Sequence, residues 1–285
     1  MAFRRKPRVS LKTPEQLGVM RRAGLLLDRI HDEIEKNLRS GMTTADIDQI
    51  SRAVIAEAGA KSNFLGYHGF PATVCVSVNE EIVHGIPGTR VIHDGDVVSV
   101  DAGCIVDGWH SDAARTHIVG TARSEADREL VDVTRGAMWE GIAALATATR
   151  VGEIGAAIED YVAECAGERI QHLEEFGGHG IGRAMHEPPD VMNFRTHDRG
   201  PKIVPGMALC IEPMLIQGDG EFDILDDEWT VVATKGGRAA HFEHSVAVTE
   251  TGIFVLSAAD GGKAELAKRG VTIAEEPSDH TAPGR

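Results

Sequence analysis

Residues 96–119 have the sequence DVVSVDAGCIVDGWHSDAARTHIV, and this stretch decides the fold. Both halves are rich in Val and Ile, and they meet at Asp107-Gly108, a dipeptide typical of two-residue hairpin turns. The stretch therefore predicts two antiparallel strands, residues 96–106 and 109–119.

The predicted register brings two carboxylates together. If Asp107-Gly108 is the turn, Gly103 lies opposite Asp112, so Asp101 and Asp112 are diagonal neighbours on one face and Gly103 leaves the space between them empty. Two such acids repel each other unless they share a positive charge, which a pair of metal ions supplies. The alternative is that both acids lie on a solvated sheet face, and an isolated Asp pair favours that alternative.

Other acids occur in similar apolar settings. Glu212 lies within residues 208–214 and Glu243 within residues 242–248, and each of these stretches consists mainly of apolar residues. His179 lies in a glycine-rich stretch, where the backbone can approach a ligand closely. A shell of carboxylates with one or two imidazoles suits Mn(II), Fe(II), Co(II) or Zn(II), and the residue types do not choose among these metals.

Helices are predicted before and after the hairpin. Thr13-Pro14 begins an amphipathic run that ends near Gly41, and Thr44 begins another. Two more helical stretches follow, before a final set of strands, so the order of helices and then strands occurs twice and the fold class is α+β. A shift of 107 positions aligns the second helix of each half, which indicates an internal duplication but is also what two unrelated amphipathic helices show.

Composition limits the class of protein. The 285 residues carry a formal net charge of −15, which argues against general nucleic-acid binding. The four cysteines form no Cys-x-x-Cys pair and are expected to be reduced. No apolar run is long enough to span a membrane and no signal peptide is evident, so a cytoplasmic location without membrane association is expected.

The two ends differ from the middle in composition. Residues 1–12 form a basic arm with five Lys or Arg and no acid. We expect a frayed terminus, and the alternative is an arm that docks on ribosomal RNA. Residues 257–285 are rich in Ala, Gly, Glu and Lys and are expected to form a flexible C-terminal tail. The domain boundaries are therefore 1–12, 13–256 and 257–285.

Six motifs, in this order, resemble the type I methionine aminopeptidases over residues 13–256. The motifs are Leu65-Gly66-Tyr67-His68-Gly69-Phe70-Pro71, Val83-His84-Gly85-Ile86-Pro87, Asp101 with Asp112, Gly178-His179-Gly180-Ile181-Gly182, Ile211-Glu212-Pro213-Met214 and Phe242-Glu243-His244. The resemblance implies the pita-bread fold, in which two pseudo-symmetric αβ halves surround a dinuclear metal site.

The resemblance also implies the ligands of two divalent metal ions, Co, Mn, Fe or Zn. Asp101 is expected to bind one ion, His179 and Glu212 the other, and Asp112 and Glu243 both. Glu212 is further expected to take and pass a proton during hydrolysis.

The substrate-binding residues are implied in the same way. His84 is expected to meet the scissile amide nitrogen, and His186 to orient the carbonyl. The pocket for the methionine side chain is expected to consist of Tyr67, Phe70, Cys75, Met185 and Trp229. Phe64 stands where some relatives have a smaller Cys, which puts the pocket depth in doubt, and Ser111 replaces a common Gly with no clear effect.

The implied function is removal of the initiator methionine from nascent polypeptide N-termini, with preference for a small second residue. The enzymatic alternative is an Xaa-Pro aminopeptidase or prolidase of the same fold, although those usually carry another N-terminal domain. The non-enzymatic alternative is a relative that only binds protein or RNA, which loss of ligands would mark. We expect a monomer that associates with the ribosome only if residues 1–12 dock there.

Overall fold

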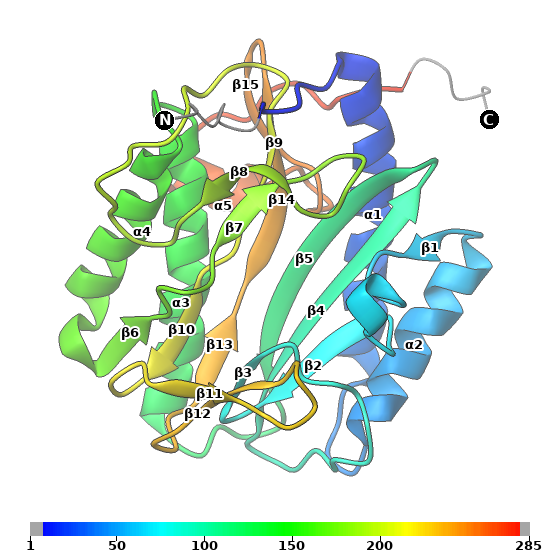
Figure 1. Cartoon of the computed structure of the whole chain (residues 1–285), viewed down its shortest axis with the longest axis vertical. Helices are drawn as coiled ribbons and strands as arrows, with labels where there is room; N and C mark the ends of the chain where they lie inside the picture. Colours follow the sequence, from blue (N-terminus) through cyan, green and yellow to red (C-terminus); the bar gives the residue numbers. More distant parts are fainter. Residues whose placement is uncertain (1–7, 280–285) are drawn as a thin grey trace, which may run out of the picture.

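A curved antiparallel sheet occupies the centre of the molecule in the computed structural model, which describes residues 8–279 (Figure 1). The main sheet has the order β1-β4-β5-β14-β9-β7-β8, with β2 also paired to β4 and β15 to β14. These strands are β1 (Lys61–Ser62), β2 (Val74–Val78), β4 (Val97–Val106), β5 (Trp109–Ile118), β7 (Gly178–Gly180), β8 (Glu187–Val191), β9 (Ala208–Ile211), β14 (Glu243–Thr249) and β15 (Gly252–Val255).

Two small sheets lie beside the main one, in the orders β13-β10-β6 and β11-β12-β3. Their strands are β3 (Glu81–Val83), β6 (Ile170–His172), β10 (Met214–Gln217), β11 (Phe222–Ile224), β12 (Val231–Ala233) and β13 (Ala239–His241). The hairpin has the predicted register, because Val106 pairs with Trp109 and Gly103 with Asp112. The α+β class expected from the sequence is therefore confirmed.

Helices cover the sheet in two pairs, one from each half of the chain (Figure 1). They are α1 (Pro14–Asn37), α2 (Thr44–Glu57), α3 (Glu125–Leu145) and α4 (Gly152–Cys165), followed by the short α5 (Lys263–Lys268). The Thr13 side chain accepts a hydrogen bond from the backbone N–H of Gln16, whose side chain accepts one from Thr13 in return, so the predicted start of α1 is confirmed. Within residues 8–279, no helix is both long and apolar enough to cross a membrane.

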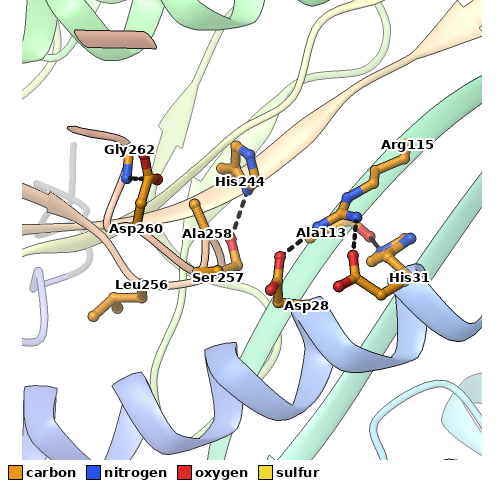
Figure 2. Close-up of polar contacts among 12 residues, drawn as sticks. Asp28, His31, Ala113, Arg115, His244, Leu256, Ser257, Ala258, Asp260 and Gly262 are labelled. Atoms are coloured by element: carbon orange, nitrogen blue, oxygen red, sulfur yellow. Dashed lines mark hydrogen bonds and ion pairs between the residues drawn. The ribbon is translucent and has the colours of Figure 1, made fainter. Parts of the chain in front are cut away.

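Polar contacts fix α1 to the hairpin (Figure 2). The Arg115 guanidinium on β5 donates hydrogen bonds to Asp28 and Asp32, and the ring Nε2 of His31 lies 2.9 Å from the carbonyl oxygen of Ala113. His31 is fully buried, so its imidazole is packed between the helix and the strand. These contacts hold β5 in place from the side of the sheet that α1 covers.

The C-terminal stretch differs from the flexible tail expected over residues 257–285. Its described part, up to residue 279, contains α5 and packs on α1. The buried Arg21 side chain donates hydrogen bonds to the carbonyls of Leu256 and Ala258, and it pairs with Glu276. A Cβ at Gly24 would lie 2.0 Å from the Leu256 carbonyl oxygen, so only glycine permits this close approach.

The basic arm predicted for residues 1–12 falls partly outside the described residues, since Arg4, Arg5 and Lys6 are not among them. Arg8 is exposed. Lys12 is buried instead, and its ammonium donates hydrogen bonds to Glu187 at 2.9 Å and to the Ser10 carbonyl at 3.0 Å. Lys12 is thus a structural residue rather than part of a solvated cationic arm.

Candidate metal centre

The hairpin brings Asp101 and Asp112 to the middle of the main sheet. Asp101 pairs with Ala114 across the hairpin and with Cys75 on β2, while Asp112 pairs with Gly103. Asp112 is 4% exposed, so the alternative of acids on a solvated face does not hold. The diagonal relationship predicted from the turn places both carboxylates at one cavity, which they line.

Neighbouring strands supply the other predicted ligands. Glu243 begins β14 and pairs with Ala114, beside the hairpin. Glu212 directly follows β9, the strand on the other side of β14, and His179 lies on β7, which pairs with β9. The order of strands in the sheet therefore brings four stretches that are distant in the sequence together at one site.

Three groups of candidate metal-ligand atoms share Glu243. Candidate ligand atoms of Asp101, Asp112 and Glu243 all lie within 4.8 Å of one another. The same holds for the group of Glu212, His241 and Glu243 and for that of His179, Cys210 and Glu243. The structure thus brings together all five predicted ligands at a cavity of about 240 Å³.

Each carboxylate of this cluster has a buried oxygen that is left unsatisfied. Within residues 8–279, no hydrogen-bond partner is found for one oxygen on each of Asp101, Asp112, Glu212 and Glu243. Burial raises the pKa of Asp101 and of Glu212 to about 7. At Asp101 the nearby His241 opposes this rise and Glu212 adds to it. At Glu212 the nearby His179 opposes it. Burial and then the other acids raise the pKa of Asp112 and Glu243 well above the usual range. Divalent metal ions fit this site, because they offset the repulsion and satisfy the free oxygens.

The ring orientation of His179 also suits metal binding. Its Nδ1 lies 2.9 Å from the Gly180 carbonyl oxygen, which can only accept a hydrogen bond, so Nδ1 carries the proton. The unprotonated Nε2 then points to the cluster and lies 3.3 Å from Glu212. A backbone carbonyl that fixes the tautomer in this way is a common support for a metal-binding histidine.

The space beside Gly103 is filled rather than empty, contrary to the prediction from the hairpin. A Cβ at Gly103 would lie 2.0 Å from the Asn63 side-chain oxygen. Asn63 is buried and donates a hydrogen bond to the Ser111 carbonyl at 3.4 Å. The glycine is needed to admit the amide of Asn63, a residue that no sequence pattern singles out.

The two further predicted histidines face the same cavity. His84 and His186 both line it, and the His186 ring centroid lies 4.3 Å from that of His179. Burial lowers the pKa of His84 to about 4, so this imidazole is neutral at neutral pH. The Tyr67 hydroxyl oxygen lies 2.8 Å from Nδ1 of His186 and orients that ring.

The predicted pocket residues form one apolar cluster, and all of them except Trp229 line the cavity. It contains Phe64, Phe70, Cys75 and Met185 as buried members, with Tyr67 and Trp229 packed against them. The Phe70 and Trp229 ring centroids are 5.0 Å apart in an edge-to-face arrangement. An apolar side chain can therefore be held directly beside the carboxylates.

Sequence reasoning missed several other residues of the cavity, among them two with rings. His241, at the end of β13, and Phe176, whose ring centroid lies 5.9 Å from that of His84, both line it. His241 precedes Glu243 by two positions, and this spacing places side chains on one face of an extended chain. This two-residue spacing is the sequence signal by which His241 could have been found.

Comparison with known proteins identifies the family. The model of metallopeptidase family M24 matches residues 18–250. Over 246 residues the chain is 42% identical to methionine aminopeptidase 1 of Bacillus subtilis (strain 168), covering 86% of this chain and 98% of that protein. It is also 42% identical to methionine aminopeptidase 1 of Mycobacterium tuberculosis, covering 87% of this chain and 95% of the relative.

Solved structures agree with this assignment. The crystal structure of methionine aminopeptidase from Thermotoga maritima superposes with a TM-score of 0.84 at 36% identity, covering 88% of this chain and 99% of that one. The prolidase of Pyrococcus furiosus has a TM-score of 0.67 at 20% identity and shares the fold, and this chain covers 65% of it. The expected pita-bread fold is thereby confirmed, and the chain belongs to metallopeptidase family M24, among the methionine aminopeptidases.

Proposed function

We propose that this protein is a metal-dependent aminopeptidase that removes the N-terminal methionine from nascent proteins and prefers a small second residue. One observation carries the proposal: the cavity joins a cluster of buried carboxylates and His179 to an apolar pocket that contains Phe70, Cys75 and Met185. An unbranched thioether side chain suits such a pocket. The adjacent cluster then lies beside the first peptide bond.

The proposed cofactor is a pair of divalent metal ions. Asp101 would hold one ion, His179 and Glu212 the other, and Asp112 and Glu243 both, since Glu243 belongs to every candidate group. When bound, such ions supply Lewis acidity and lower the pKa of a water molecule towards neutrality. The residue types present do not favour one metal among Co, Mn, Fe and Zn.

The chain itself positions the substrate and moves the proton. His84 would contact the scissile amide nitrogen and His186, oriented by Tyr67, the carbonyl oxygen. Glu212 would accept a proton from the attacking water and pass it to the leaving amine, as a general base and then a general acid. Placement of the substrate amine at the carboxylates would restrict cleavage to the first peptide bond.

The first test is release of free methionine from Met-Ala-Ser and Met-Leu-Ser. Metal-stripped protein is assayed with Mn(II), Fe(II), Co(II) or Zn(II) restored singly, together with Asp112→Asn and Glu243→Gln. We expect metal-dependent release from Met-Ala-Ser only, lost in both variants and kept in the exposed controls Asp226→Asn and Glu250→Gln. Activity confined to Xaa-Pro peptides would favour the prolidase alternative, and no release with any metal would favour a binding protein.

The proposed partners are nascent chains in the cytoplasm, met by a monomer, and docking on the ribosome is the alternative to a frayed N-terminus. Because the Lys12 ammonium is already paired with Glu187, the charge for docking would come from Arg4, Arg5, Lys6 and Arg8. If these residues dock, cosedimentation with ribosomes should fall when all four are replaced by Ser. Unchanged cosedimentation would exclude the docking arm, and light scattering would test the monomer.

A further inference from the structure

His241 lines the cavity but has no role among the predicted ligands. It is the last residue of β13 and pairs with Met214 on β10. Its backbone N–H donates to the Thr116 hydroxyl oxygen at 2.9 Å, and that hydroxyl donates to the His241 carbonyl at 2.7 Å. With 3% exposure and both backbone groups bonded to the same side chain, His241 is held firmly against the hairpin.

The ring of His241 points to Glu212. Its Nε2 is buried, has no hydrogen-bond partner in the described part of the chain, and lies 3.7 Å from Oε2 of Glu212. The other oxygen of that carboxylate, Oε1, lies 3.3 Å from Nε2 of His179. Glu212 therefore lies between two imidazoles, one facing each of its oxygens.

Of these two imidazoles, only that of His179 is expected to bind metal through Nε2. The distance of 3.7 Å is longer than a hydrogen bond, but catalytic contacts often tighten when the site is assembled. An imidazole with hydrogen on Nε2 is a donor, and a carboxylate oxygen is the acceptor that it lacks. Carboxylates at metal sites are commonly oriented by such a second hydrogen bond.

We propose that His241 is a positioning residue for Glu212: its Nε2–H donates to Oε2 and directs Oε1 toward the metal ions. The inference rests on the proposed function, because it assigns the proton-transfer residue Glu212 a fixed orientation. Without this contact the carboxylate can rotate about its terminal bond, and fewer of its conformations can both face the metal ions and accept the proton.

The test compares two replacements of His241. His241→Gln retains an N–H donor at a similar reach, whereas His241→Leu retains apolar volume without a donor. The partly exposed His172→Gln on β6, outside the cavity lining, is the control. Each protein is stripped of metal, titrated with Mn(II) and Co(II) by calorimetry, examined for the visible absorption of bound Co(II), and assayed for kcat and KM on Met-Ala-Ser.

We expect His241→Leu to weaken metal binding and to lower kcat, each by about 10- to 100-fold, with KM little changed and the Co(II) spectrum altered. His241→Gln should recover most of both losses, and His172→Gln should resemble the unaltered protein. The proposal is wrong if His241→Leu binds metal and turns over normally, or if His241→Gln is as impaired as His241→Leu, which would indicate packing alone.

The failure of this inference can be distinguished from failure of the proposed function. If the unaltered protein binds metal but releases no methionine, the proposed function fails, while the comparison of metal dissociation constants still tests His241. If the unaltered protein cleaves Met-Ala-Ser and all three variants match it, only the role of His241 is lost. Thermal unfolding of each variant verifies that the proteins compared are folded.

Discussion

The Ser245 side chain bridges both backbone groups of Asp112: its hydroxyl oxygen accepts a hydrogen bond from the N–H at 3.0 Å and donates one to the carbonyl at 2.8 Å. Ser245 lies on β14, two residues after Glu243, and is fully buried. One hydroxyl thus joins the strands that carry the two ligands proposed to bridge the metal ions. The same region receives support from His244, whose Nδ1 lies 2.9 Å from the Ser257 hydroxyl (Figure 2).

Replacement of Ser245 by Ala should destabilise the protein. The change leaves a buried N–H and a buried carbonyl of Asp112 without partners, so the free energy of unfolding should fall by about 1–3 kcal/mol. Urea unfolding monitored by circular dichroism measures the change. Thr89→Ala, at an exposed position, is the control and should stay within about 0.5 kcal/mol. A loss at Ser245 no larger than that of the control would contradict the bridging role.

Lys12 should matter for stability more than its position near the N-terminus suggests. Lys12→Met leaves the partly buried Glu187 without its cation, although Arg183 and Ala184 still donate backbone N–H groups to it. Loss of one partner of a fully buried pair costs about 3 kcal/mol, so this partly buried pair should cost about 1–3 kcal/mol. Urea unfolding should show that cost, and Arg8→Met, at an exposed position, should change the free energy of unfolding little. Adding Glu187→Gln to Lys12→Met should recover part of the loss, and the absence of any recovery would exclude the pair as its cause.

Tyr67→Phe should lower kcat by about 10-fold, because removal of a hydrogen bond worth about 1.4 kcal/mol frees the His186 ring. KM for Met-Ala-Ser should change little, since the aromatic ring stays in the pocket. The sequence offers a matched control in Tyr161→Phe, because its other tyrosine lies on α4 away from the cavity. Equal kcat values for the two variants would show that the hydroxyl does not orient His186.

His31 should make stability sensitive to mild acid. Burial, and then the nearby Arg115, lower the pKa of His31 well below 6.5, so the folded protein keeps this ring neutral while the unfolded chain binds a proton. The free energy of unfolding should therefore fall as the pH drops below about 6.5, by up to about 1.4 kcal/mol per pH unit from this group.

The measurement is urea unfolding of metal-stripped protein between pH 6.5 and 5.5. His31→Gln should reduce the dependence on pH by about 1 kcal/mol per unit, and the same change at exposed His197 serves as the control. An identical pH dependence in His31→Gln and the unaltered protein would show that another group carries the effect.

Local chemistry made the hairpin and its acids predictable from the sequence. The Asp107-Gly108 turn fixes a register, and the register alone decides that Asp101 and Asp112 share a face. The start of α1 was predictable for the same reason, since the hydrogen bonds of Thr13 and Gln16 lie within one turn.

The remaining features depend on contacts between distant residues. Lys12 meets Glu187, 175 positions later, and nothing near either residue in the sequence indicates the pair. The described part of the stretch after Leu256 is held in place by isolated features, such as the burial of Leu266 and the hydrogen bonds from Arg21 to backbone carbonyls. Such features leave no periodic pattern of apolar residues in the sequence. Composition alone therefore predicted a flexible tail where the structure has a packed segment.

The packing of that segment on α1 has a consequence for synthesis of the protein. α1 is translated well before residues 256–279, which supply the carbonyls that Arg21 binds and the backbone that fits against Gly18 and Gly24. This side of α1 therefore stays uncovered while the residues between the two segments are translated. Folding of α1 against its neighbours can be completed only after residues 256–279 have left the ribosome, so the native state depends on a segment that is translated much later than the helix it covers.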